Sequence, residues 1–294
     1  MEVRYEIITP EVAREYLEKN VGNYRQINKS RVTEYATDMK FGRWKDNGES
    51  IKFSKSGHLA DGQHRLMAIC KSGTPIGMYV VRGVDDDCST FDVGQPRTSS
   101  QILVAEGTNP AASNQHSFGA ARILVTGRFV YRSGKQMQSA QWASTNALVR
   151  EYAKSHQVVL ADSYRIVMTN SGHSGATLSR KSPVIAAVYC MLRRGENKEK
   201  LFQFFNVVNT GFPIDGVECT PALALRNQLL AHKGISGTSE SCRMHDFSST
   251  VKAYDDFRNG VPGRRSYRLA PSNDRGLAAL LYVVSRDTFC ELEA

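Results

Sequence analysis

The sequence lacks the patterns that mark several large classes of protein. Its 294 residues include six cysteines, but none forms a C-x-x-C pair, which argues against a structural zinc site. The chain is not small and shows no secretory signal, so we expect free thiols in a reducing cytoplasm rather than a disulfide framework. No apolar run reaches the roughly 18 residues that a membrane span needs. These absences leave an ordinary globular protein with no membrane partner.

Positive charge is what the sequence has in excess. Lys and Arg number 38 against 29 Asp and Glu, and the formal net charge is +9. Clustered Lys and Arg attract phosphate over long distances, so this balance favours polyanionic partners, nucleic acid first. A globular protein whose surface is merely basic is an equally open interpretation.

The first hundred residues predict a compact α/β unit. Thr9 and Pro10 form an N-cap followed by proline at the first helical position, and Ser30 would cap a second helix. Residues 54–57 have the composition of a hairpin turn. The expected strands cover residues 3–8, 51–53, 59 onward and 76–81, and the expected helices begin after Thr9, cover residues 31–41 and follow Gly62.

Beyond residue 98 the helical pattern dominates and strand signals are scarce. We therefore predict the α+β class, with a small α/β domain at residues 1–98 and a mainly helical domain of unknown role at residues 99–294. The helices expected there cover residues 99–103, 120–125, 144–154, 183–193, 198–208, 221–230 and 276–285.

The segment Asp61-Gly62-Gln63-His64-Arg65 lies at a strand-to-helix junction and has the chemistry of a phosphate site. Gly62 permits a tight turn, and the helix that follows begins with unpaired N–H groups at its positive end. Arg65 adds a fork of donors, His64 can donate or transfer a proton, and Asp61 can cap the helix or hold a metal or a hydroxyl. The alternative is a capped helix with His64 and Arg65 merely on its surface.

The same residues carry a family resemblance. Glu49 to Phe53, followed by Leu59 to Ala68 with D-G-Q-H-R at the centre, resembles the signature of the ParB/sulfiredoxin superfamily, and is most similar to its ParB-like phage and mobile-element members. The likeness covers about residues 5–98. It implies a ParB/sulfiredoxin-like nucleotide-binding domain that binds ATP or CTP, in a bacterium or a phage-infected host cell.

Carried over by position, the resemblance implies phosphate contacts from Gly62, His64 and Arg65. Gln63 stands within the same phosphate-binding loop, at the position of the catalytic cysteine of sulfiredoxins. Glutamine cannot serve as that nucleophile, so sulfinate reduction is excluded.

Residues on either side of the junction are candidates to complete the site. Glu49 precedes the hairpin and could act as a general base or support a metal; a solvated loop acid is the other interpretation. Asp92, Gly94 and Arg97 follow the last strand of the unit and could close over a nucleotide, as the D-x-G-x-x-R segment of the resembling phage proteins implies. A plain linking turn is the alternative there.

A basic cluster lies near the end of the chain, where a tyrosine is interleaved with arginines. This arrangement suits phosphate contact combined with base stacking, although a solvated basic loop explains it as well. The residues predicted to contact nucleic acid there are Arg264, Arg265, Tyr267 and Arg268.

Three functions compete at this stage. The first is an enzyme that transfers or hydrolyses the terminal phosphate of ATP or CTP, with Glu49, Asp61 and His64 as catalytic groups and Mg²⁺ as an optional companion. The second is a DNA-binding protein switched by the nucleotide, and the third is a ParB-like nuclease. The sequence shows no clear helix-turn-helix for the second and no carboxylate cluster for the third. Assembly into a homo-oligomer is left open.

Overall fold

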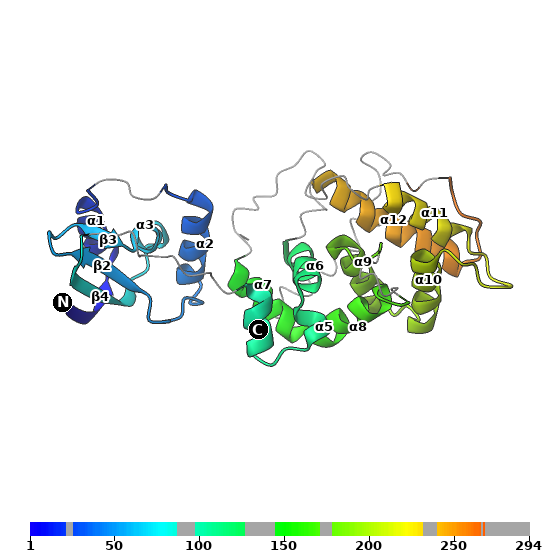
Figure 1. The fold of residues 1–294 in the computed structure, drawn as a ribbon, viewed down its shortest axis with the longest axis horizontal. Coiled ribbons are helices and arrows are strands. Elements are labelled where there is room, and N and C mark those ends of the chain that lie inside the picture. Colours follow the sequence, from blue (N-terminus) through cyan, green and yellow to red (C-terminus); the bar gives the residue numbers. More distant parts are fainter. Residues whose placement is uncertain are drawn as a thin grey trace. The chain divides into compact units, whose positions relative to one another are not determined.

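The computed structural model describes residues 1–21, 26–86, 98–126, 145–170, 178–231, 240–265 and 267. Within these ranges the chain forms two compact units (Figure 1). Unit 1 comprises Met1–Pro96 and Ala140–Leu148, and unit 2 comprises Arg97–Ser139 and Val149–Ala294. The first division along the chain lies beside the predicted one at residue 98, whereas the assignment of residues 140–148 to unit 1 has no counterpart in the prediction.

Unit 1 contains a mixed four-stranded sheet in the order β1-β4-β2-β3. β1 pairs antiparallel with β4, β4 pairs parallel with β2, and β2 and β3 form the predicted antiparallel hairpin. Gly57 in the hairpin turn has a φ of +83°, which glycine adopts without strain. The strands are β1 (Glu2–Ile8), β2 (Ser50–Ser54), β3 (Leu59–Asp61) and β4 (Ile76–Val84).

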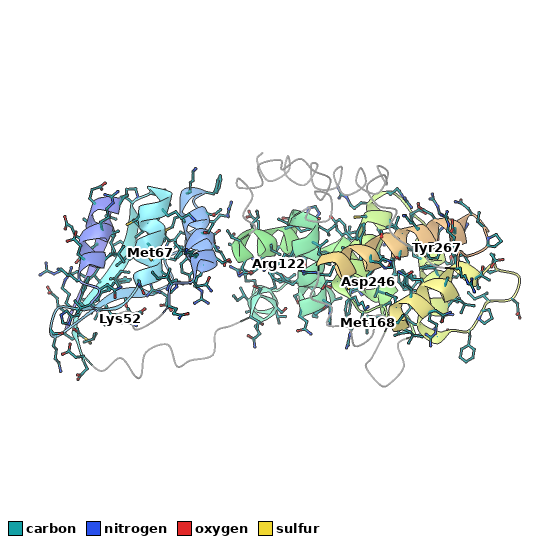
Figure 2. All side chains as sticks on the ribbon, turned by 90° about the horizontal axis from the view of Figure 1, so that it is seen from above. Lys52, Met67, Arg122, Met168, Asp246 and Tyr267 are labelled. Carbon is teal, nitrogen blue, oxygen red and sulfur yellow. The ribbon has the colours of Figure 1, made fainter. Side chains whose placement is uncertain are left out.

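Three helices cover one face of this sheet: α1 (Pro10–Glu18), α2 (Lys29–Lys40) and α3 (Gln63–Ser72). Figures 1 and 2 show α3 between the other two. Alternation along β2 and β4 directs their apolar side chains into the core, whereas β1 contributes only Ile8 and leaves Val3, Tyr5 and Ile7 exposed. The core consists of Ile8, Ala13, Val32, Ala36, Met39, Ile51, Phe53, Leu59, Leu66, Ala68, Ile69, Met78 and Val80.

Local signals predicted the starts of these helices with mixed success. Thr9 is the N-cap of α1, and its hydroxyl accepts from the Val12 N–H, as expected. The prediction of Ser30 as the cap of α2 is wrong, because the Asn28 side chain accepts from the Arg31 N–H and the helix begins two residues earlier than predicted. Both residue types cap well, so capping preference alone does not choose between Asn28 and Ser30.

All the regular secondary structure in the described residues of unit 2 is helical. α9 is its central helix, with every residue from Pro183 to Met191 buried, and α6, α8 and α12 pack against it. A helix that is apolar on all sides requires this position. The helices from residue 98 onward are α4 (Ser99–Ala105), α5 (Pro110–Ser113), α6 (Gln115–Thr126), α7 (Asn146–Ser155), α8 (Gln157–Val167), α9 (Ser182–Arg193), α10 (Lys198–Thr210), α11 (Thr220–Ala231) and α12 (Glu240–Arg258).

The prediction of a mixed α/β part followed by a mainly helical part is confirmed at this level. The prediction missed α5, α8 and α12, and it recognised only the end of α6. The helix expected at residues 276–285 lies outside the described residues. Among the described helices, none combines the length and the apolar character needed to cross a bilayer.

Candidate functional site

Gly62 is the hinge of the strand-to-helix junction. Its φ is +108°, in the left-handed region, and it is the N-cap of α3 without a capping side chain. A β carbon at this position would lie 2.5 Å from Ile51 Cδ1 and 3.3 Å from Ile51 Cα. The Gly62 N–H donates to Asp61 Oδ1 at 2.7 Å. The glycine is therefore required by the turn itself, and its own N–H is engaged within the protein.

Arg65 lies in the first turn of α3, and its guanidinium points back over the hairpin. Nη2 donates to the backbone oxygen of Ser50 at 2.8 Å and to Asp61 Oδ2 at 3.1 Å. Nη1 donates to Glu49 Oε2 at 3.2 Å. The side chain is only 12% exposed, so its charge is fixed in one place at the N-terminal end of α3.

Asp61 also forms an ion pair with a lysine on the neighbouring strand. Lys52 lies directly opposite it across the β2–β3 pair, and its Nζ is 3.1 Å from Asp61 Oδ2. Figure 2 shows Lys52 on the sheet, apart from Met67 on α3. Burial alone would raise the pKa of Asp61, but the charge of Arg65 and the hydrogen bond and charge of Lys52 outweigh it and hold the pKa below its usual value. Asp61 is therefore an ionised carboxylate around neutral pH.

His64 is tied to the helix beside it. Its Nε2 accepts the backbone N–H of Asn28, the N-cap of α2, at 2.9 Å. A ring that accepts at Nε2 is neutral and carries its proton on Nδ1. The Nε2 atom of His64 is therefore occupied by the start of α2.

Glu49 belongs to the same cluster, but it is held loosely. Its carboxylate is 55% exposed and bonds to Arg65 alone among the described side chains. Its backbone N–H donates to the Asn47 side chain at 3.1 Å, in a turn where Gly48 has a φ of +78°. The structure thus brings together the predicted Glu49, Asp61, Gly62 and Arg65, whereas His64, which follows Gln63 at the start of α3, bonds to Asn28.

Other predicted site residues lie elsewhere or are not described. Asp92, Gly94, Arg97 and Arg268 fall outside the described residues. Arg264 and Arg265 are both exposed, and Arg264 Nε pairs with Asp256 Oδ2 at 3.1 Å. Within the described ranges no group of three or more His, Cys, Asp or Glu side chains could hold a metal ion.

The stacking role predicted for Tyr267 needs correction. Its ring is 1% exposed, and its hydroxyl donates to Asp256 Oδ2 at 3.1 Å. Its backbone N–H also donates to Gln228 Oε1 at 3.3 Å. A buried ring cannot stack on a base, so Tyr267 packs inside unit 2 (Figure 2) instead. The alternation of arginine and tyrosine in the sequence does not indicate that the Tyr267 ring is buried, because the residues that bury it belong to α11 and α12.

Sequence reasoning missed two residues of the cluster. Lys52 bonds to Asp61 and Asn28 bonds to His64. The hairpin register could have identified Lys52, since opposed residues of paired strands contact each other. Nothing local could have placed Asn28 against a histidine that lies 36 residues further along the chain.

In comparisons with known proteins, no protein-family model, no curated protein and no solved structure matches the chain.

Proposed function

We propose that unit 1 binds the phosphate groups of a nucleoside triphosphate at the N-terminus of α3. One observation carries the proposal: Arg65 and Lys52 each approach the same Asp61 oxygen to 3.1 Å, beside the positive end of the helix. The two cations are therefore no more than about twice this distance apart. Arg65 and Lys52 together suit an anion with several charges. The start of α3 beside them has no capping side chain.

The resemblance to the ParB/sulfiredoxin superfamily supports the same assignment. The hairpin, the left-handed Gly62 and the helix start lie where the resemblance implies the phosphate-binding loop. On this proposal the ligand is ATP or CTP. The resemblance implies a further phosphate contact from His64, and Mg²⁺ could accompany the phosphates.

The reaction proposed for the site is transfer or hydrolysis of the terminal phosphate. Arg65 and Lys52 would balance the charge that develops on the phosphoryl oxygens. Asp61 is ionised, so it could accept a proton or hold a metal, but it has no proton to donate. Because its charge also positions Arg65, we assign Asp61 a positioning role and leave the activation of the attacking group to Glu49 or to a bound metal.

DNA binding controlled by the nucleotide is the second candidate. The net charge of +9 favours it, since a basic protein is drawn to a polyanion. The burial of Tyr267 removes the one aromatic residue that was expected to stack on bases. Nuclease activity remains a further alternative, without an observation of its own in the described residues.

The test is a titration of the purified chain with labelled ATP, CTP and GTP, with and without DNA, followed by assay of phosphate release. We expect saturable binding of at least one triphosphate. Turnover would support the enzyme, whereas binding without turnover that changes DNA affinity would support the switch. Absence of binding to every triphosphate would overturn the proposal.

Two variants of Arg65 sharpen this test. Arg65→Ala removes the fork and should abolish binding, and Arg65→Lys keeps the charge but loses the paired donors. Circular dichroism must show that each variant is folded, because Arg65→Ala leaves the mostly buried Asp61 with Lys52 as its remaining cation. Weakened binding in a folded Arg65→Lys variant would show that the fork itself contacts phosphate.

A further inference from the structure

The two carboxylates that hold Arg65 differ in how firmly each is fixed. Asp61 is 17% exposed and has three partners: the Gly62 N–H, Lys52 and Arg65. Glu49 is 55% exposed and reaches Arg65 through Nη1 alone, at 3.2 Å. An exposed single contact of this kind contributes little stability, whereas Asp61 could leave only by breaking several interactions.

We propose that Glu49 is a built-in competitor of the phosphate ligand, one that occupies Nη1 of Arg65 until the triphosphate displaces it. The inference rests on the proposed function, because it requires Arg65 to contact phosphate. It also changes the part given to Glu49, from a catalytic group to one that sets the affinity and selectivity of the site.

The local backbone allows the Glu49 side chain to move without refolding the turn. The Glu49 N–H is held by Asn47, and the Gly48 N–H donates to Asp46 Oδ1 at 3.2 Å, so the main chain stays in place. The carboxylate is already largely in water, so turning it outward desolvates nothing. A rotation of the side chain is enough to uncover Nη1.

The guanidinium has donors to offer once Glu49 has moved. Nη2 stays bonded to Ser50 and Asp61, which keeps the fork oriented. Nη1 carries two N–H groups, and Nε is buried without a hydrogen-bond partner among the described residues. Displacement of Glu49 therefore opens the Nη1 edge of a guanidinium that is already fixed in position.

The charges of the cluster explain why a polyphosphate would succeed where a weaker anion fails. Glu49 and Asp61 balance Lys52 and Arg65, so the closed cluster is neutral. When Glu49 turns outward, one net positive charge is exposed beside the helix N-terminus. A ligand with several negative charges gains more from that field than a singly charged anion, so the competition favours triphosphates over small anions.

The experiment measures the dissociation constants of ATP and CTP for wild type and Glu49→Gln. The amide keeps the shape of the side chain and removes its charge, so we expect binding to tighten by about two- to fivefold, the factor that corresponds to loss of an exposed ion pair. The melting temperature should change little. Glu15→Gln is the matched control, because it removes the same charge from an exposed position on α1.

The outcomes separate the inference from the proposed function. Tighter binding in Glu49→Gln, with Glu15→Gln equal to wild type, supports both. Nucleotide binding that is unchanged or weaker in Glu49→Gln overturns the inference and leaves the phosphate site standing. Equal tightening in both variants also overturns it, since that would be an effect of total charge. Absence of binding in all three proteins overturns the proposed function and the inference together.

Discussion

Gly62 approaches Ile51 so closely that a methyl group at Gly62 would lie 2.5 Å from Ile51 Cδ1, inside the core of unit 1. Gly62→Ala should therefore destabilise unit 1 for two reasons, the positive φ and the clash, which together cost about 1–3 kcal/mol. Denaturant unfolding followed by circular dichroism measures the loss.

Gly57→Ala is the matched control for that change. Its φ is +83°, but nothing lies within 4 Å of the β carbon that would be added. This substitution carries the strain without the clash, so it should cost less than Gly62→Ala. Equal costs would show that Ile51 gives way easily and that the close approach does not constrain the junction.

Acid should weaken unit 1 through Asp61. Arg65 and Lys52 lower the pKa of this carboxyl on folding, so its contribution to stability is fully present above its unfolded pKa of about 4 and disappears as the pH falls through the lower folded value. In Asp61→Asn the decline in melting temperature below about pH 5 should be shallower. The same pH dependence in the variant and in wild type would assign the acid sensitivity to other carboxyls.

Tyr267 offers a test of packing against nucleic-acid contact. Tyr267→Phe removes the hydrogen bond to Asp256 but leaves Arg264 as a partner of that carboxylate, so it should lower the free energy of unfolding of unit 2 by about 1 kcal/mol. The affinity of the chain for DNA, measured by fluorescence anisotropy, should stay the same. A large loss of DNA affinity in a stable Tyr267→Phe variant would restore the predicted role in binding.

The cysteines of unit 2 should react at very different rates. Burial raises the pKa of the Cys190 thiol to about 12, within the buried stretch of α9, whereas Cys242 on α12 is only half-buried. Alkylation at pH 8 followed by mass spectrometry should label Cys242 in the native protein and leave Cys190 unmodified until the unit unfolds. Rapid labelling of Cys190 would mean that α9 is not enclosed as described.

The sequence predicted what depends on neighbouring residues. Thr9 caps a helix as expected, and Gly62 adopts a left-handed conformation at the start of α3. Each of these features follows from the preference of one residue type for one backbone conformation. The cluster of charged and polar residues around α3 was likewise visible as a motif before its geometry was known.

What escaped prediction depends on residues far apart in the chain. The engagement of Arg65 by Glu49 follows from the course of the hairpin, and the burial of Tyr267 follows from the packing of α11 and α12. Local preference carries no information about such partners, because a residue's chain neighbours do not specify its neighbours in space.

The position of β4 in the sheet has a consequence for how unit 1 forms during synthesis. β1 is made before the other strands, yet its one partner among the described strands is β4, which pairs with it from Glu2 opposite Arg82 to Ile8 opposite Ile76. A nascent chain that has emerged only as far as α3 has no neighbour for β1 and lacks the inner strand that joins β1 to β2. We expect ribosome-bound chains to stay open to protease until Val84 has left the exit tunnel, and then to close the sheet in one late step.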